Sequence, residues 1–253
     1  TDIRTTGGFL RSFSTFDTSF AFALYLMVVL LIGLAVAIGA PRRLRNQLFF
    51  LSIPVILAAM AVTITRVAVL GLVAGLVYLA IAKYRSLVLV LVDGIVIAAV
   101  LLVIAASFSG AFLSTTSSEA RFDLWGENVA EIAAHPFGTG VGASGAAAEK
   151  AADVAGIDEE VFQPDNYYFK VAYEFGVIGL WLFALFLVAA ATSTHQAARR
   201  LTGSDAALAS GVTACVIAAA VASVVATYFE IFPLDAFFWL LLAVVATCPS
   251  ESR

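Results

Sequence analysis

The chain has 253 residues, of which 62% are hydrophobic and only 13% are charged, and its formal net charge is −4. The mean hydropathy is +0.99, whereas a soluble domain usually has about a quarter of its residues charged. This composition excludes a soluble globular protein and indicates an integral membrane protein, and the net charge gives no indication of a nucleic-acid partner.

Charged residues leave long apolar stretches that predict about seven transmembrane helices. A helix needs about 20 apolar residues to cross the hydrocarbon core. The sequence therefore predicts an all-α integral membrane protein, a polytopic helical bundle forming a single transmembrane domain over 1–253. The predicted spans are 19–40, 46–64, 67–82, 86–109, 167–192, 206–228 and 234–248. Because the opening TDIRTTGGF has no initiator methionine or cleavage signal, we expect the C-terminal part of a longer protein.

The basic residues predict the orientation of the spans. They cluster in alternate loops, as Arg42, Arg43 and Arg45, then Lys83 and Arg85, then Arg199 and Arg200. Short cytoplasmic loops carry an excess of Lys and Arg. We therefore expect the 63–66 turn and a large 110–166 loop, between the fourth and fifth spans, on the extracytoplasmic side.

Arg66 lies in a turn between two predicted spans that are too short to extend it far into water. Residues 46–82 must form two spans and a turn, and 67–82 give about 24 Å of helix against a core of about 30 Å. We therefore expect Arg66 to be recessed at the outer edge and to face the bundle. An arginine there indicates a functional site, and the alternative is a snorkelling anchor.

The first half of the outer loop predicts a helix and a turn. Apolar residues at helical spacing predict an amphipathic helix over 119–134, with Trp125 near the lipid headgroups, that ends at His135-Pro136. The following GTGVGASG (138–145) lacks the G-K-[ST] of a P-loop and predicts a turn that allows a close backbone approach. Residues 143–160 predict a second short surface helix.

The fifth predicted span begins at Tyr167. Lys170 and Glu174 stand at i, i+4 and are expected to neutralise each other. Gly176 and Gly179, one turn apart, predict close helix packing.

Three charged residues together suit transfer from a lipid-linked diphosphate. A guanidinium group binds phosphate through two hydrogen bonds and stays charged, so Arg66 and Arg121, predicted on the same side, suit a dianionic group. Asp165, just before a span on that side, can activate an attacking hydroxyl. Intramembrane Asp93 is expected to pair inside the bundle.

Five motifs in order resemble those of the O-antigen ligase/polymerase family of bacterial membrane enzymes. They are RTTGGF at 4–9, TITR at 63–66, SSEARFDLW at 117–125, HPFGTGVG at 135–142 and DNYYFKVAYEFGVIG at 165–179. The resemblance implies a GT-C-like fold in the cytoplasmic (inner) membrane, with the active site on the extracytoplasmic side. It also implies a glycosyltransferase whose partners are a polyprenyl-diphosphate-linked glycan donor, such as an undecaprenyl diphosphate, a glycan or lipid acceptor, and membrane lipid.

The resemblance also assigns roles to residues. Arg66 and Arg121 would hold the carrier diphosphate. The family's ligases have a histidine, a small polar residue, nine residues and G-x-x-G, and here Asp165 stands in the place of that histidine. This departure favours a polysaccharide polymerase over a ligase. We predict metal-independent inverting transfer without a cofactor, catalysed by Arg66, Arg121 and Asp165. The predicted substrate-binding residues are Arg4, Asn166, Tyr167, Trp125 and Glu230.

Two other classes of function remain open on the sequence. Intramembrane Asp93, Glu174 and Arg66 also fit a transporter or channel, although no internal repeat is present. A scaffold in an envelope assembly would tolerate loss of these residues. Glu230 either contacts sugar hydroxyls or caps a helix.

Overall fold

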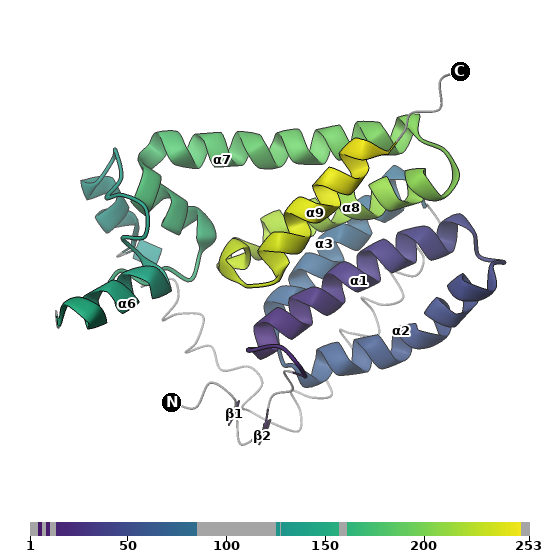
Figure 1. Ribbon diagram of the computed structural model, residues 1–253, viewed down its shortest axis with the longest axis horizontal. Coiled ribbons are helices and arrows are strands. Elements are labelled where there is room, and N and C mark those ends of the chain that lie inside the picture. The colour runs from purple at the N-terminus through teal and green to yellow at the C-terminus, as the bar shows by residue number, and fades with distance from the viewer. Residues whose placement is uncertain are drawn as a thin grey trace. The chain divides into compact units, whose positions relative to one another are not determined.

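The computed structural model describes residues 5–6, 9–10, 14–84, 125–126, 128–156 and 161–248. Apart from loops and one short strand pair, these residues are helical. The helices are α1 (Ser19–Gly39), α2 (Leu44–Val62), α3 (Arg66–Ala82), α6 (Gly145–Ala155), α7 (Tyr167–Arg200), α8 (Gly203–Ala222) and α9 (Leu234–Thr247), with a 3-10 turn, η1 (Tyr228–Glu230) (Figure 1). The strands β1 (Thr5–Thr6) and β2 (Phe9–Leu10) pair antiparallel.

The prediction of a helical integral membrane protein is confirmed. Among the described residues, α1, α2, α7 and α8 are long and apolar enough to cross a membrane, and α3 and α9 are shorter apolar helices. The predicted span 86–109 lies outside the described residues, so the count of seven stays a prediction, as does the single domain over 1–253.

The described residues fall into two compact units. The bundle unit contains α1, α2, α3, α8, α9 and α7 from Val188 onward. The loop unit contains the described residues between 125 and 187, together with 223–227.

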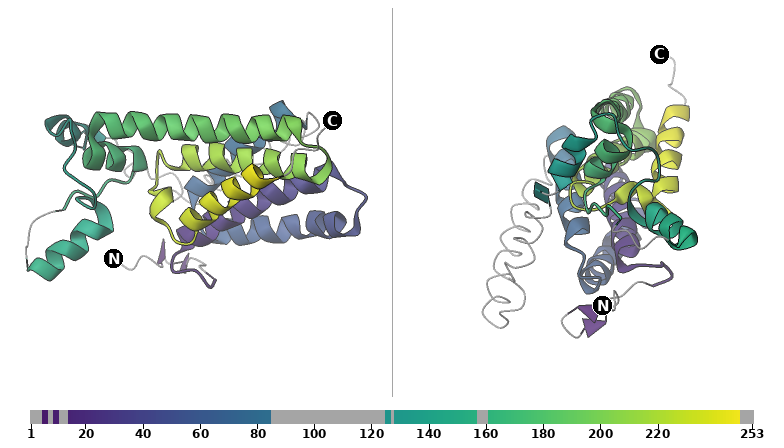
Figure 2. Two further views of the ribbon diagram at one scale, coloured as in Figure 1. Left: turned by 45° about the horizontal axis from the view of Figure 1, so that its top comes forward. Right: turned by 90° about the vertical axis from the view of Figure 1, so that its left-hand side faces the viewer.

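Small residues bring the helices of the bundle unit close together. Helix α1 lies against α2, α3 and α8 (Figures 1 and 2). A Cβ atom added at Gly75 of α3 would lie 2.6 Å from Leu31 Cδ1 of α1 and 3.1 Å from the carbonyl oxygen of Ala214 of α8. Gly71 has the same kind of surroundings, with Met27 and Ala218. The G-x-x-x-G sequence of α3 is therefore a helix-packing face.

The helix contacts gather the basic residues at one end of the bundle unit. The Tyr84 hydroxyl, just after α3, donates to the carbonyl oxygen of Ala35 near the end of α1 at 2.9 Å. Lys83 donates to Ser210 Oγ in the first half of α8 at 3.5 Å, and burial lowers the pKa of its ammonium group. The ends of α1 and α3 therefore lie beside the start of α8. We call this the basic end; its cations are Arg42, Arg43, Arg45, Lys83, Arg199 and Arg200.

Large apolar side chains cover the outside of α2. Leu51 and Val55 are 75% and 70% exposed. Burial of such side chains drives the folding of soluble proteins, so their exposure is expected for a helix that faces acyl chains.

Candidate functional site

The turn that carries Arg66 has a constrained geometry. Thr63 is fully buried and donates its hydroxyl to the carbonyl oxygen of Met60 at 2.6 Å, and the buried Thr65 donates to the carbonyl oxygen of Thr63 at 3.2 Å. Between them Ile64 has a φ of 54°, a left-handed conformation that β-branched residues rarely adopt. Such strain persists only where the surrounding structure imposes it.

This turn places Arg66 as the first residue of α3, at the end of the helix away from the basic end. The N-terminus of a helix carries partial positive charge and favours anions. Arg66 adds a full positive charge at the same place, so the start of α3 suits an anionic group. The Arg66 side chain is exposed rather than buried in the bundle, and its depth in a membrane stays a prediction.

In the loop unit, Gly176 breaks α7 into two helical segments. Its φ of 71° and ψ of −171° are not helical, and only glycine adopts such values at low cost. The prediction that Gly176 and Gly179 form a helix-packing face is therefore wrong for Gly176. At Gly179 an added Cβ atom would meet the side chain of Phe175, which also belongs to α7. The missing side chain at Gly179 therefore leaves space for Phe175, the residue just before the break.

The glycine-rich segment, residues 136–145, replaces the hydrogen bonds that this break removes. We call it the glycine loop. The amide of Thr139 donates to the carbonyl oxygen of Tyr173 at 2.9 Å, and the amide of Gly140 donates to that of Glu174 at 3.0 Å. On the far side of the break the amide of Val177 donates to the carbonyl oxygen of Pro136 at 3.1 Å. The loop therefore completes the backbone pairing of α7.

The prediction of a close backbone approach at this loop is confirmed, and the backbone approached is that of α7. Gly138 has a φ of +86°, and a Cβ atom added there would lie 2.5 Å from the carbonyl oxygen of Glu174 and 2.7 Å from the amide nitrogen of Gly176. No other residue type fits this position without displacing the main chain.

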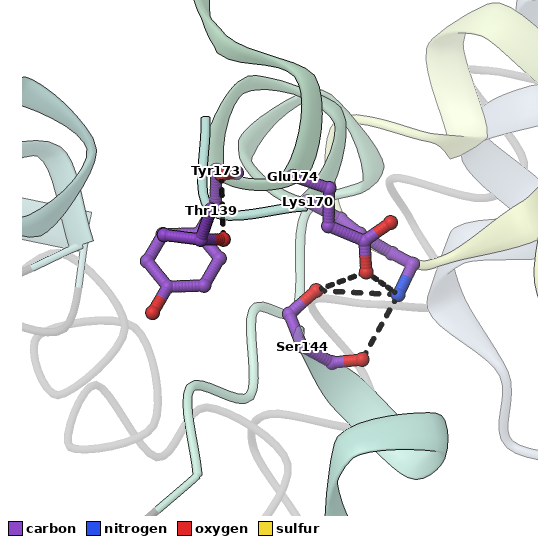
Figure 3. Close-up of polar contacts among 5 residues, drawn as sticks. All are labelled: Thr139, Ser144, Lys170, Tyr173 and Glu174. Carbon is purple, nitrogen blue, oxygen red and sulfur yellow. Dashed lines mark hydrogen bonds and ion pairs between the residues drawn. The ribbon is translucent and has the colours of Figure 1, made fainter. Parts of the chain in front are cut away.

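A buried polar network fastens the end of the glycine loop to α7 (Figure 3). Lys170 Nζ lies 2.7 Å from Glu174 Oε1 and donates to both the carbonyl oxygen and Oγ of Ser144, at 3.1 and 3.2 Å. Ser144 Oγ donates to Glu174 Oε1 at 2.8 Å. The three residues are 0–7% exposed. Because each buried charge has an opposite charge and hydrogen bonds, the network satisfies the requirement for burying ions.

The network confirms the predicted Lys170–Glu174 pair and adds a residue that the sequence analysis missed. Ser144 is 26 positions before Lys170, so no helical spacing relates them. The signal available was weaker: Ser144 is the second residue of the predicted helix 143–160, and in the structure it directly precedes α6.

Asn166 is the N-cap of α7. Its Oδ1 accepts from the amides of Tyr168 at 2.8 Å and Phe169 at 3.4 Å, as asparagine commonly does at this position. Nine residues, 167–175, separate this cap from the break at Gly176, which is about 13 Å of helix. The motif spacing noted in the sequence is thus the length of one helical segment. Asp165 directly precedes the cap and is exposed.

Aromatic contacts surround the first turn of α7. The Trp125 ring meets Phe169 edge to face at 5.7 Å, and the Tyr167 ring lies 5.3 Å from Phe183. The amide of Tyr167 donates to the carbonyl oxygen of Ser223 at 2.9 Å. These contacts hold the segment that follows Asp165.

The predicted helix end at His135-Pro136 is confirmed, since residues 128–134 are helical and His135 is not. His135 Nδ1 donates to the carbonyl oxygen of Glu131 at 3.1 Å, and its ring lies edge to face on Tyr173 at 5.8 Å. This arrangement fits a structural role.

The predicted site residues are distributed over both units. Trp125, Asp165, Asn166 and Tyr167 belong to the loop unit, where the last three are consecutive and Trp125 packs close to them. Arg66 and Glu230 belong to the bundle unit, where Glu230 is an exposed residue of η1. Arg4, Asp93 and Arg121 lie outside the described residues.

Within the ranges that the structure describes, no three His, Cys, Asp or Glu side chains gather as a metal ion would require. The substrate-binding and catalytic roles of all the site residues stay predictions.

Comparison with protein families matches residues 53–184 to the family described as O-antigen ligase. The match covers slightly more than half of the chain and runs from α2 into α7. It includes the TITR turn, the glycine loop, Asp165 and Gly176. No curated protein matches the chain.

Proposed function

The chain belongs to the O-antigen ligase family, and from this premise we propose that it is a polysaccharide polymerase that uses a polyprenyl-diphosphate-linked glycan. The family and the apolar helices make it an integral membrane protein with a ligase-like or polymerase-like function in polysaccharide biosynthesis. The observation that carries the proposal is that one family match spans Arg66, Arg121 and Asp165. Asp165, in place of the ligase histidine, favours polymerisation.

The orientation in the proposal rests on the basic end of the bundle unit. Clustered Lys and Arg residues favour the cytoplasm, so Arg66, at the other end of α3, faces the extracytoplasmic side. We place the 110–166 loop on that side as well, in a GT-C-like arrangement of about seven spans in the bacterial inner membrane. The donor diphosphate would then be bound at the outer surface.

In the proposed reaction the acceptor hydroxyl attacks the anomeric carbon of the donor glycan. Asp165 accepts the hydroxyl proton while the new C–O bond forms. The bond from the anomeric carbon to the phosphate oxygen breaks, and the polyprenyl diphosphate leaves with both bonding electrons. Arg66 and Arg121 stabilise the negative charge that develops on it, and direct displacement inverts the anomeric centre.

The local structure supports the role of each described residue. Arg66 stands at a helix N-terminus, after a turn held by two buried threonine hydroxyls. Asp165 is exposed and precedes a helical segment fixed by its cap, by the glycine loop and by the buried network. Catalytic groups need such support, because misplacement by about 1 Å lowers rates by about 100-fold.

The test measures turnover of a purified lipid-linked repeat unit by the reconstituted full-length chain. Arg66→Ala and Arg121→Ala should each lower kcat by about 30- to 1000-fold, since loss of one charge-stabilising donor costs about 2–4 kcal/mol. Asp165→Asn should lower kcat, because an amide cannot accept the hydroxyl proton. Arg42→Ala, at the basic end, is the matched control and should keep wild-type turnover.

The products separate the two activities within the family. A glycan lengthened on the carrier identifies a polymerase, whereas a single transfer to another lipid or to a protein identifies a ligase. Near-wild-type turnover in both arginine variants would refute the mechanism whichever product is formed.

A further inference from the structure

A groove with a volume of about 390 Å³ lies in the bundle unit and is lined by α3, α7 and α8. Tyr78 of α3, His195 and Arg199 of α7, and Ile217 of α8 are among its lining residues. Tyr78 is 12 residues from Arg66, or about 18 Å along the helix. The groove is therefore separate from the proposed diphosphate site and lies toward the basic end.

The face of α7 that lines the groove changes from apolar to cationic along the helix. Ala191, His195 and Arg199 follow one another at intervals of four residues, so they share one face and span about 12 Å. Arg199 is exposed and stands in the last turn of α7. Arg199 therefore lies at the end of this face nearer the basic end, and Ala191 lies at the other end. The groove is also lined by Ile217, Thr192, Gln196 and Thr213.

A polar pair lies in the groove between Ala191 and Arg199 along α7. The Tyr78 hydroxyl is 2.7 Å from His195 Nδ1, and the two rings meet edge to face at 5.8 Å. Polar side chains within membrane-spanning helices are costly and usually mark a function. The pair places a hydroxyl and an imidazole in the groove, four residues before Arg199 on α7.

We propose that this groove binds an anionic phospholipid of the cytoplasmic leaflet. Its acyl chain would lie against Ala191 and Ile217, and its phosphate would accept hydrogen bonds from Arg199. Charge complementarity selects this occupant, because basic pockets between helices on the cytoplasmic side suit anionic headgroups and guanidinium suits phosphate. The proposal depends on the orientation of the bundle unit and not on glycan transfer.

The experiment measures lipid binding to the full-length chain in a neutral detergent, by native mass spectrometry and by thermal shift. Added phosphatidylglycerol should bind and raise Tm, whereas phosphatidylcholine and inorganic phosphate should not. Arg199→Gln should weaken phosphatidylglycerol binding about tenfold, the value of one hydrogen bond to a charged group. Arg200→Gln removes the same charge from the neighbouring residue, which does not line the groove, and should stay within about twofold of wild type.

Two further variants keep the test decisive. Arg199→Lys preserves the charge without the two-pronged geometry and should bind with intermediate affinity, which guards against a folding defect in Arg199→Gln. Tyr78→Phe should weaken binding less than Arg199→Gln. Equal losses for Arg199→Gln and Arg200→Gln, equal shifts with phosphatidylcholine, or a response to inorganic phosphate alone would each overturn the proposal. No donor glycan is present, so the outcome is independent of the transferase activity.

Discussion

Gly138 and Gly176 face each other across a contact that leaves no room for a side chain. Both have positive φ values, and a Cβ atom on either one would collide with the main chain of the other segment. Glycine is therefore required at each for two separate reasons, conformation and space. Gly140 has only the first reason, because its φ is +108° but nothing lies within 4 Å of an added Cβ atom.

This difference predicts two distinct effects on stability. Gly140→Ala should cost about 1–2 kcal/mol, the penalty for a left-handed residue with a side chain. Gly138→Ala should cost about 1–3 kcal/mol more, because it also forces overpacking against Glu174. Thermal unfolding of the purified variants in detergent measures both. Equal destabilisation would show that the close approach does not exist.

At the residue scale, the sequence could predict local relations and no distant ones. Lys170 and Glu174 were predicted as a pair because four residues make about one helical turn. Ser144 was not, because only the tertiary fold brings it to Lys170. Asn166 is found as a helix cap, a role that its place before an apolar run also indicates. Its predicted contact with substrate stays a prediction.

At the scale of elements, α7 is the helix for which prediction from sequence was least complete. The predicted span 167–192 matched its start, but the helix continues to Arg200 and contains a break. Hydropathy does not register the break, because glycine is tolerated in apolar helices. The glycine loop was predicted to approach some backbone, but that α7 is its partner depends on contacts between residues more than 30 positions apart.

The buried network between the glycine loop and α7 should behave as a coupled unit. Lys170→Met or Glu174→Met alone should cost about 3–5 kcal/mol, since each leaves an unpaired buried charge. The double variant should cost less than the sum of the two by about 1–3 kcal/mol. A double-mutant cycle on unfolding in detergent measures this coupling.

The control for this double-mutant cycle is a substitution on the same helix. Trp181→Phe, at an exposed position of α7, should leave both stability and the cycle unchanged. Strictly additive effects of the two methionine substitutions would mean that Lys170 and Glu174 are not paired.

For the whole molecule, the alternation of apolar stretches and basic loops was enough to predict a polytopic helical membrane protein. The predicted starts of the spans agree with α1, α2, α3, α7, α8 and α9 to within three residues. A common site for Arg66, Arg121 and Asp165 is a proposal that spacing in the sequence cannot establish, because such a site depends on long-range packing between segments. Family membership supports their common role instead.

The proposed orientation predicts which surfaces a membrane-impermeant maleimide reaches. In intact spheroplasts, cysteine introduced as Asp153→Cys on α6 should be labelled, whereas Arg42→Cys and Ser204→Cys should react only after permeabilisation. The Lys and Arg clusters are the basis of this proposed orientation. Replacing the native Cys215 and Cys248 by alanine gives the unlabelled background. Labelling of Arg42→Cys in intact spheroplasts would reverse the topology and with it the location of the active site.

The break at Gly176 has a consequence for biosynthesis. The break leaves the carbonyl groups of Tyr173 and Glu174 without partners inside α7, and lipid offers no hydrogen bonds to them. Their partners are amides of the glycine loop, which is synthesised earlier. The segment that enters the bilayer by itself therefore starts near Val177, and the 24 residues up to Arg200 give about 36 Å of helix, enough to cross. In the proposed orientation the loop is translocated before α7 is inserted, so the order of synthesis is also the order in which this pairing can form.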